Sequence, residues 1–231
     1  MERFLFYLRL FPGAEPEYER RHAAIWPELT AAIRESGLRN MTGFRRGTDV
    51  WYYLEAHPDA ATAMALHGAK RVKSDWNEYF RNVIAEMTDA DGELFTYREI
   101  FHSNGASSAS GGASGGAGDS QGTGGSTFER GCFSLIVEPG REHEYDELHH
   151  HAWPELIDAI QAAGIRNYTG FRRGVHVVYY GEFHPEMATA FARLGETEVD
   201  KRWSEAFEGI ISTITDADGN LLVAREVFHQ D

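Results

Sequence analysis

The sequence predicts an α+β protein in which one small domain occurs twice along the chain. Two stretches of about 102 residues align without a gap when the 231-residue chain is shifted by 127 positions. A low-complexity segment separates these stretches. Within each of them, apolar strand-like runs alternate with helical runs that begin or end at proline and glycine.

The two copies match along their whole length. About half of the aligned positions are identical, so we expect both copies to share one fold. The matched segments are HAAIWPEL (22–29) with HHHAWPEL (149–156), RNMTGFRRG (39–47) with RNYTGFRRG (166–174), and TDADG (88–92) with TDADG (215–219).

The segment between the copies is predicted to be a flexible linker. Residues 103–127 hold nine of the 24 glycines of the chain, and their single charged residue is Asp119. Such a segment buries too little apolar surface to offset its chain entropy. We therefore divide the chain into a first repeat (1–102), a linker (103–127) and a second repeat (128–231).

The composition is that of a globular protein with a surplus of acidic residues. Hydrophobic residues make up 42% of the chain, and the net charge is −14 at pH 7. This charge argues against nucleic acid or an anionic membrane as a partner. No apolar run approaches the roughly 18–20 residues of a membrane span. Cys132 is the single cysteine, so no intrachain disulfide is possible, and we expect a cytoplasmic protein.

The first half of each copy is predicted to hold a strand and two helices. In the first copy, the strand covers 3–11 and ends at Pro12-Gly13. A helical run covers 15–25, where aromatic side chains recur every four residues. Pro27 suits the first position of a helix, so a second helix is predicted over 27–36.

The second half of the copy begins with a hairpin. Strands over 38–46 and 50–57 flank Gly47-Thr48, which is a hairpin signal. The elements predicted after it are helices over 58–66 and 73–87, a turn over 89–92 and a strand over 94–101.

The resulting order, β-α-β-β-α-β, is that of the ferredoxin-like motif, in which helices cover one face of a four-stranded antiparallel sheet. The other face must also be buried, and face-to-face packing of two such sheets would bury it. A linker of 25 residues spans roughly 25–30 Å on average. We therefore predict that the two repeats pair within one chain as a dimeric α/β barrel.

A tyrosine and a histidine one helical turn apart are the strongest candidates for catalysis. Tyr18 and His22 share a helix face in the first repeat, and Tyr145 and His149 do so in the second. Imidazole exchanges protons near neutral pH, and a phenol can orient a substrate hydroxyl. The same spacing is also compatible with a surface histidine beside a core tyrosine.

Trp76 and Trp203 occupy matching places in the last predicted helix of each repeat. An exposed indole offers a flat face to a sugar, whereas a buried indole belongs to the core, and the sequence leaves both open. The three histidines at 149–151 diverge by about 100° each on a helix, so they do not predict a metal site. The run 89–92 lacks the later ligands of a calcium loop. We expect no metal and no cofactor.

The segment YERRHAAIWPEL (18–29), the strand residue Asn40, the helix residue Trp76 and the terminal REIFH (98–102) resemble the L-rhamnose mutarotase family. The resemblance covers nearly all of each copy. It implies a small ferredoxin-like domain that pairs as a dimer. It also implies that His22 and His149 are the acid/base residues, with Tyr18 and Tyr145 in contact with the sugar.

Two positions depart from the family pattern. The second tyrosine of the family falls at Tyr168 in the second repeat but at Met41 in the first. The loss of a hydrogen-bonding phenol typically costs about 0.5–1.5 kcal/mol. The Trp-Trp pair of the family falls at Trp76-Asn77 and at Trp203-Ser204, so the second indole wall is replaced by a polar residue in both copies. The resemblance thus implies substrate contacts from Tyr18, Met41, Trp76, Asn77, Tyr145, Tyr168, Trp203 and Ser204.

The activity implied by the resemblance is the interconversion of α and β anomers of L-rhamnose or a related monosaccharide, which is an isomerase reaction. The partner is then a small sugar, with no nucleic acid and no membrane. Two alternatives stay open. One is an oxidoreductase of the dimeric α/β-barrel type, either cofactor-free or haem-dependent. The other is a non-catalytic or engineered single-chain scaffold that binds sugar.

Overall fold

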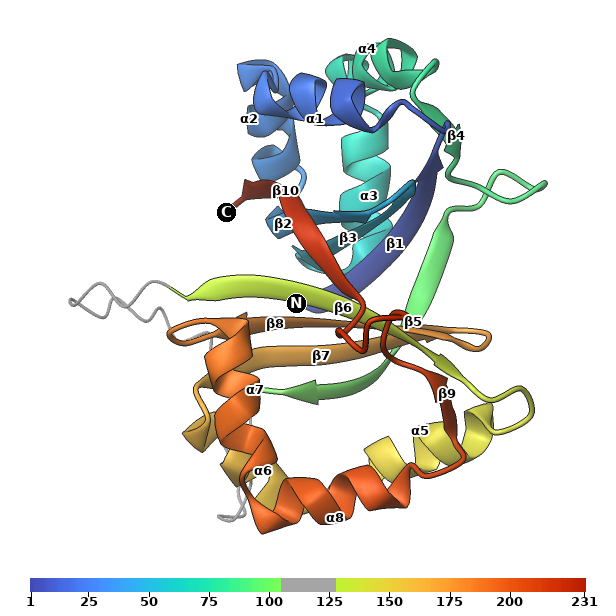
Figure 1. Ribbon diagram of the computed structural model, residues 1–231. Coiled ribbons are helices and arrows are strands. Elements are labelled where there is room, and N and C mark those ends of the chain that lie inside the picture. Colours follow the sequence, from blue (N-terminus) through green and yellow to red (C-terminus); the bar gives the residue numbers. More distant parts are fainter. Residues whose placement is uncertain (105–127) are drawn as a thin grey trace. The chain divides into compact units, whose positions relative to one another are not determined.

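The computed structural model describes residues 1–104 and 128–231 (Figure 1). The predicted linker therefore lies almost entirely outside the described residues. The elements of the first repeat are β1 (Glu2–Leu10), α1 (Glu15–Ala23), α2 (Pro27–Glu35), β2 (Leu38–Arg46), β3 (Asp49–Ala56), α3 (Ala60–Gly68), α4 (Arg71–Phe80), β4 (Ile84–Glu86) and β5 (Phe95–Ser103). Those of the second repeat are β6 (Glu129–Val137), α5 (Glu142–His150), α6 (Pro154–Ala162), β7 (Ile165–Arg173), β8 (His176–Phe183), α7 (Met187–Gly195), α8 (Glu198–Ala206), β9 (Ile211–Thr213) and β10 (Val223–Gln230).

The described residues form two compact units that combine segments of both repeats. Unit 1 consists of Met1–Glu99, Phe171–Arg173 and Val223–Asp231, and unit 2 consists of Ile100–Gly170 and Gly174–Leu222. Each unit therefore contains the last strand, or part of it, of the other repeat. This exchange of strands was not predicted from the sequence, although the pairing of the repeats was.

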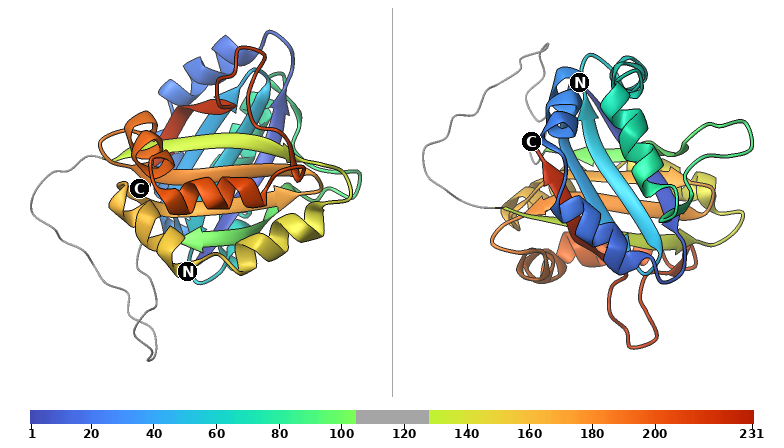
Figure 2. Two further views of the ribbon diagram at one scale, coloured as in Figure 1. Left: turned by 60° about the horizontal axis from the view of Figure 1, so that its bottom comes forward. Right: turned by 90° about the horizontal axis from the view of Figure 1, so that it is seen from above.

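Unit 1 is built on an antiparallel sheet. Strand β3 is central and pairs with β1 on one side and with β2 on the other; the two ladders include the pairs Glu2↔Ala56 and Arg46↔Asp49. Strand β5 pairs with the other edge of β1 over three residues. This is the strand order of the ferredoxin-like motif. The exchanged strand β10 adds to β2, with Gln230 opposite Met41. Helices α1 to α4 lie on one face of this sheet (Figures 1 and 2).

The core of unit 1 follows from the alternation of side chains along the strands. On β3, Val50, Tyr52 and Leu54 belong to the same buried cluster as helix residues such as Tyr18 and Phe80. The intervening Tyr53 is buried on the opposite face of the sheet, where its ring lies 6.1 Å from that of Phe171. Both faces of the sheet are therefore covered, as the predicted fold requires.

The predicted helix over 73–87 is wrong in its second half. Helix α4 ends at Phe80, and Ile84–Glu86 form the short strand β4, which pairs with β1 through Leu10↔Ile84. Val83 and Ile84 continue the apolar spacing of a helix, which explains the error. Strand pairing to β1 buries the same side chains and takes precedence over the local pattern. No helix within 1–104 or 128–231 is long and apolar enough to cross a membrane.

Candidate active site

The second repeat places Tyr145 and His149 on the buried face of α5. Both side chains are buried, with exposed fractions of 1% and 8%. The Nδ1 atom of His149 lies 2.9 Å from the carbonyl oxygen of Tyr145. Because a carbonyl oxygen only accepts, Nδ1 carries the proton in the neutral ring, and Nε2 is left as an acceptor.

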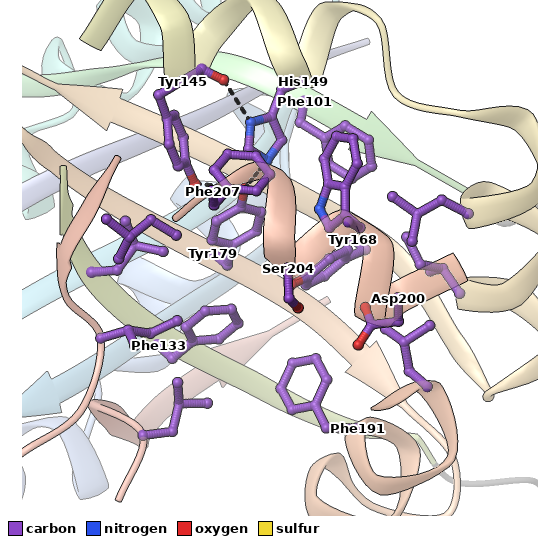
Figure 3. Close-up of a pocket in the computed structure, with 18 of the residues that line it drawn as sticks. Phe101, Phe133, Tyr145, His149, Tyr168, Tyr179, Phe191, Asp200, Ser204 and Phe207 are labelled. Atoms are coloured by element: carbon purple, nitrogen blue, oxygen red, sulfur yellow. Dashed lines mark hydrogen bonds between the residues drawn. The ribbon is translucent and has the colours of Figure 1, made fainter. Parts of the chain in front are cut away.

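A second tyrosine, Tyr179, forms a hydrogen bond to this Nε2 atom. The hydroxyl of Tyr179, on β8, lies 2.6 Å from His149 Nε2 and 2.9 Å from the hydroxyl of Tyr145 (Figure 3). Since Nε2 accepts, Tyr179 donates to it, and Tyr145 in turn donates to Tyr179. We call the chain Tyr145–Tyr179–His149 the second relay. The positions of its protons are set by the carbonyl oxygen of Tyr145, because this oxygen can only accept a hydrogen bond from His149.

The first repeat contains the same arrangement, which we call the first relay. His22 Nδ1 lies 3.0 Å from the carbonyl oxygen of Tyr18, Tyr52 lies 2.7 Å from Nε2, and the hydroxyls of Tyr18 and Tyr52 are 2.6 Å apart. Sequence reasoning missed both strand tyrosines. The available signal was that Tyr52 alternates with Val50 and Leu54 and so faces the helices.

Burial sets the protonation state of both relays. It lowers the pKa of His149 and of His22 to about 4 and raises the pKa of Tyr179 and Tyr52. At pH 7 both imidazoles are therefore neutral, and the tyrosines keep their protons. Each relay is arranged to accept a proton at Nε2 rather than to release one.

The second relay faces a cavity of about 600 Å³ in unit 2. Most of its wall is apolar, including Phe133, Leu156 and Phe207. The residues predicted from the sequence that line it are Tyr145, His149, Tyr168, Trp203 and Ser204. An apolar cavity with a few converging polar groups is the usual form of a small-molecule site.

Asp200 is a further polar group in this wall that sequence reasoning missed. It lies on α8 one helical turn before Trp203 and Ser204, so all three side chains share the helix face that lines the cavity. Figure 3 shows its carboxyl group near Tyr168 and apart from His149. Burial raises the pKa of Asp200, and burial, followed by the charges of Tyr179 and Asp200, raises that of Tyr168.

The corresponding cavity of the first repeat is about 60 Å³. The sequence-predicted residues that line it are Tyr18, His22, Met41, Trp76 and Asn77. Six of the described residues that line it differ between the copies. Met41, Asn77 and Met87 stand where the second repeat has Tyr168, Ser204 and Ile214. Lys73 stands where the second repeat has Asp200, His67 stands where it has Leu194, and the larger Ile25 stands in place of Ala152.

The exchanged strands complete both sites. Phe101 of β5 packs against His149, with ring centroids 5.6 Å apart, inside unit 2. Phe228 of β10 packs against His22 at 5.8 Å inside unit 1. Each histidine thus depends on an aromatic side chain from the other repeat. Each candidate site therefore contains residues from both repeats.

The fold and the site define a class: a two-repeat α+β protein in which each ferredoxin-like repeat buries a histidine–tyrosine relay beside a cavity. The sequence model of the L-rhamnose mutarotase family matches residues 3–103 and again 130–230. The chain therefore belongs to the L-rhamnose mutarotase family, and the family resemblance seen in the sequence is confirmed for both repeats.

Individual relatives match one repeat at a time. The L-rhamnose mutarotase of Acidiphilium cryptum (strain JF-5) is 29% identical over 102 residues, which are 44% of this chain and 98% of the relative. That of Lachnoclostridium phytofermentans (strain ATCC 700394 / DSM 18823 / ISDg) is 30% identical over 102 residues with the same coverage. These relatives are thus about as long as one repeat.

Solved structures match the chain as a whole. A structure described as a monooxygenase from Lactobacillus acidophilus NCFM covers 98% of this chain and 95% of its own, with a TM-score of 0.55 and 10% identity. A second such protein, from Fusobacterium nucleatum, has a TM-score of 0.53, 9% identity, and coverage of 99% and 93%. At this identity the likeness concerns the fold alone. It confirms the predicted class, two ferredoxin-like repeats paired as a dimeric α/β barrel.

Proposed function

We propose that the chain is a mutarotase that interconverts the anomers of L-rhamnose or a related monosaccharide, and that the second repeat carries the reaction. The main support is the second relay, which presents a directed chain of hydrogen bonds to a cavity of about 600 Å³. Membership of the mutarotase family supports the same reaction class.

The first half of the reaction opens the sugar ring. The hydroxyl oxygen of Tyr179 takes the proton of the anomeric hydroxyl while its own proton passes to His149 Nε2. The anomeric C–O bond becomes a carbonyl, the bond from that carbon to the ring oxygen breaks, and the electron pair stays on the ring oxygen. His149 then carries the positive charge, and its Nδ1–H group still donates to the carbonyl oxygen of Tyr145.

The ring oxygen needs a proton at the same time, and we assign this role to Asp200, which lines the same cavity. A carboxyl group whose pKa is raised by burial is a suitable general acid. Rotation about the bond from C1 to C2 then turns the aldehyde over. Closure reverses both transfers: Asp200 takes the proton back, and His149 returns its proton through Tyr179. Both groups end each cycle in the state in which they began it.

The first repeat is not proposed to process the sugar. Its cavity of about 60 Å³ is well below the roughly 150 Å³ that encloses a six-atom ring such as benzene. It also lacks the two polar groups that flank the second relay, because Met41 and Lys73 stand in place of Tyr168 and Asp200. The chain thus contains a matched internal control for the catalytic site.

The test is saturation-transfer NMR of anomer exchange on L-rhamnose and L-fucose. We expect His149→Ala to reduce the protein-dependent exchange at least about 100-fold, and His22→Ala to leave it within about threefold. Equal loss in the two variants would assign the reaction to both sites. Exchange that survives His149→Ala, or that the unaltered protein does not accelerate, would contradict the proposed function.

A further inference from the structure

The cavity of the first repeat contains two polar groups that have no counterpart in the second. His67 on α3 and Lys73 on α4 both line it, and the aligned residues are Leu194 and Asp200. No aspartate or glutamate is among the described residues that line this cavity. The two changes lie on neighbouring helices and alter the same wall, so they give this cavity its own binding chemistry.

His67 presents an unused hydrogen-bond acceptor. Its side chain is buried, with 4% exposed, and Nδ1 has no hydrogen-bond partner among the described residues. Burial, followed by the charge of Lys73, lowers the pKa of His67 to about 4, although a hydrogen bond to the carbonyl of Ala32 acts in the opposite direction. The ring is therefore neutral at pH 7. Because a carbonyl only accepts, the other nitrogen carries the proton, and Nδ1 is left as a bare acceptor.

Lys73 presents an unpaired cation beside it. Within the described part of the chain, burial is the sole influence on the pKa of its ammonium group, with no contribution from a hydrogen bond or a neighbouring charge. Its charge lowers the pKa of both His22 and His67, after burial, so the ammonium group lies within electrostatic reach of both rings. Burial lowers the pKa of Lys73 itself to about 8, and the group is mostly charged at pH 7.

A cation and a bare acceptor in the wall of one small cavity match one kind of small molecule. The ligand must carry an anionic group for Lys73 and a neighbouring hydroxyl that donates to His67. A volume of about 60 Å³ is roughly four to six times the 10–15 Å³ that one water molecule needs, so the ligand has about five non-hydrogen atoms. A buried acceptor of this kind also rejects analogues that lack the donor, because it would stay unpaired.

We propose that the first-repeat cavity binds a small 2-hydroxycarboxylate of the size of glycolate, with the carboxylate at Lys73 and the hydroxyl donating to Nδ1 of His67. This assigns the first repeat a ligand of a different chemical class from the neutral sugar of the second. The assignment does not depend on sugar catalysis, because it rests only on residues of the first-repeat cavity.

The experiment is a calorimetric titration of the full chain with glycolate, acetate and glycolamide. We expect one equivalent of glycolate to bind, acetate to bind at least about tenfold more weakly for lack of the hydroxyl, and glycolamide not to bind for lack of charge. Failure of glycolate to bind when it is present in 10-fold molar excess over protein at about 1 mM would overturn the proposal. Acetate that binds as tightly as glycolate would also overturn it.

Variants locate the site. Lys73→Met should abolish glycolate binding, whereas Lys201→Met, which removes a surface lysine of the second repeat paired with Glu198, should not change it. His67→Leu, which copies Leu194, should lower the affinity for glycolate to that for acetate and leave acetate unchanged. Thermal melts verify that each variant is folded. Glycolate affinity that is the same in Lys73→Met and in the unaltered protein would refute the assignment.

The pH dependence gives a further readout. Affinity should fall as the pH rises through about 8, where Lys73 loses its charge. The other titratable groups that face the cavity are His22, which burial keeps neutral above about pH 4, and Tyr18 and Tyr52, whose pKa values burial raises. They do not change charge between pH 6 and 9. Affinity that stays constant to pH 9.5 would contradict a role for the ammonium group.

Discussion

Replacing Tyr179 by phenylalanine removes one oxygen atom from the centre of the second relay. In the proposed mechanism this oxygen stands between His149 and the sugar, because both imidazole nitrogens are already engaged, Nδ1 by the Tyr145 carbonyl and Nε2 by Tyr179. Positioned proton transfer typically contributes a factor of about 10²–10⁴ in rate. We therefore expect Tyr179→Phe to lower anomer exchange at least about 100-fold.

The same change has a cost in stability that can be worked out from the structure. It removes two hydrogen bonds, of 2.6 and 2.9 Å, and leaves the Nε2 atom of His149 buried without its donor. At about 0.5–1.5 kcal/mol for a lost bond and about 1–3 kcal/mol for a buried unpaired group, the free energy of unfolding should fall by about 2–4 kcal/mol. Urea unfolding measures this fall.

Tyr52→Phe in the first relay is the matched control. It removes bonds of 2.7 and 2.6 Å, so its cost in stability should be similar, yet exchange should stay within about threefold. Comparison of the two variants separates catalysis from structure. If Tyr179→Phe retains exchange at the level of Tyr52→Phe, the histidine must act on the sugar directly, and the reasoning about the relay is wrong.

Three further predictions concern the second site. Asp200→Asn should lower exchange at least about 100-fold and remove the decline in rate that we expect of the unaltered protein as rising pH deprotonates Asp200. Asp200→Glu should restore part of the rate, and a pH profile that is unchanged in Asp200→Asn would exclude Asp200 as the acid. A Cβ atom at Gly170 would lie 2.8 Å from the Tyr179 ring, so Gly170→Ala should displace that ring, destabilise the fold by about 1–3 kcal/mol and lower exchange, as NMR of the variant can test. The pKa of His149 is about 4 in the folded state and about 6.5 in the unfolded state. Its contribution to the free energy of unfolding is therefore complete above pH 6.5 and falls by about 3 kcal/mol as the pH decreases to 4. Urea unfolding at several pH values should show this decrease, and His149→Gln should reduce it.

Local sequence patterns were sufficient for most of the fold. Prolines, glycines and apolar spacing placed the helices and the hairpin within two or three residues of their positions, because these signals act over a few residues. The end of α4 was missed because Val83 and Ile84 fit a helix as well as a strand, and only pairing with Leu10 decides between them. The exchange of β5 and β10 was missed because the two copies carry nearly the same strand, so local pattern cannot indicate which sheet each one joins.

Part of the candidate site could be predicted from local sequence patterns, and part depends on contacts between distant segments. The spacing of Tyr145 and His149 on one helix is visible in the sequence, and the structure brings both to one cavity. Tyr179 was missed because its approach to His149 depends on how α5 packs across β8, over a separation of 30 residues. Asp200 was missed because a single acidic residue on a helix is usually a solvated one, and only the cavity beside it indicates a different role.

Joining two copies in one chain permits a difference that two identical chains cannot have. In a symmetric dimer, a substitution at one position changes both sites, so a lysine in place of Asp200 would appear in each cavity. In this chain, position 73 is a lysine and position 200 is an aspartate, while both relays keep the same residues and nearly the same distances. The aromatic supports Phe101 and Phe228, exchanged between the repeats, also remain alike. The relay residues are therefore the same in both repeats, whereas polar residues of the cavity walls differ, which is the arrangement expected if the two sites bind different ligands.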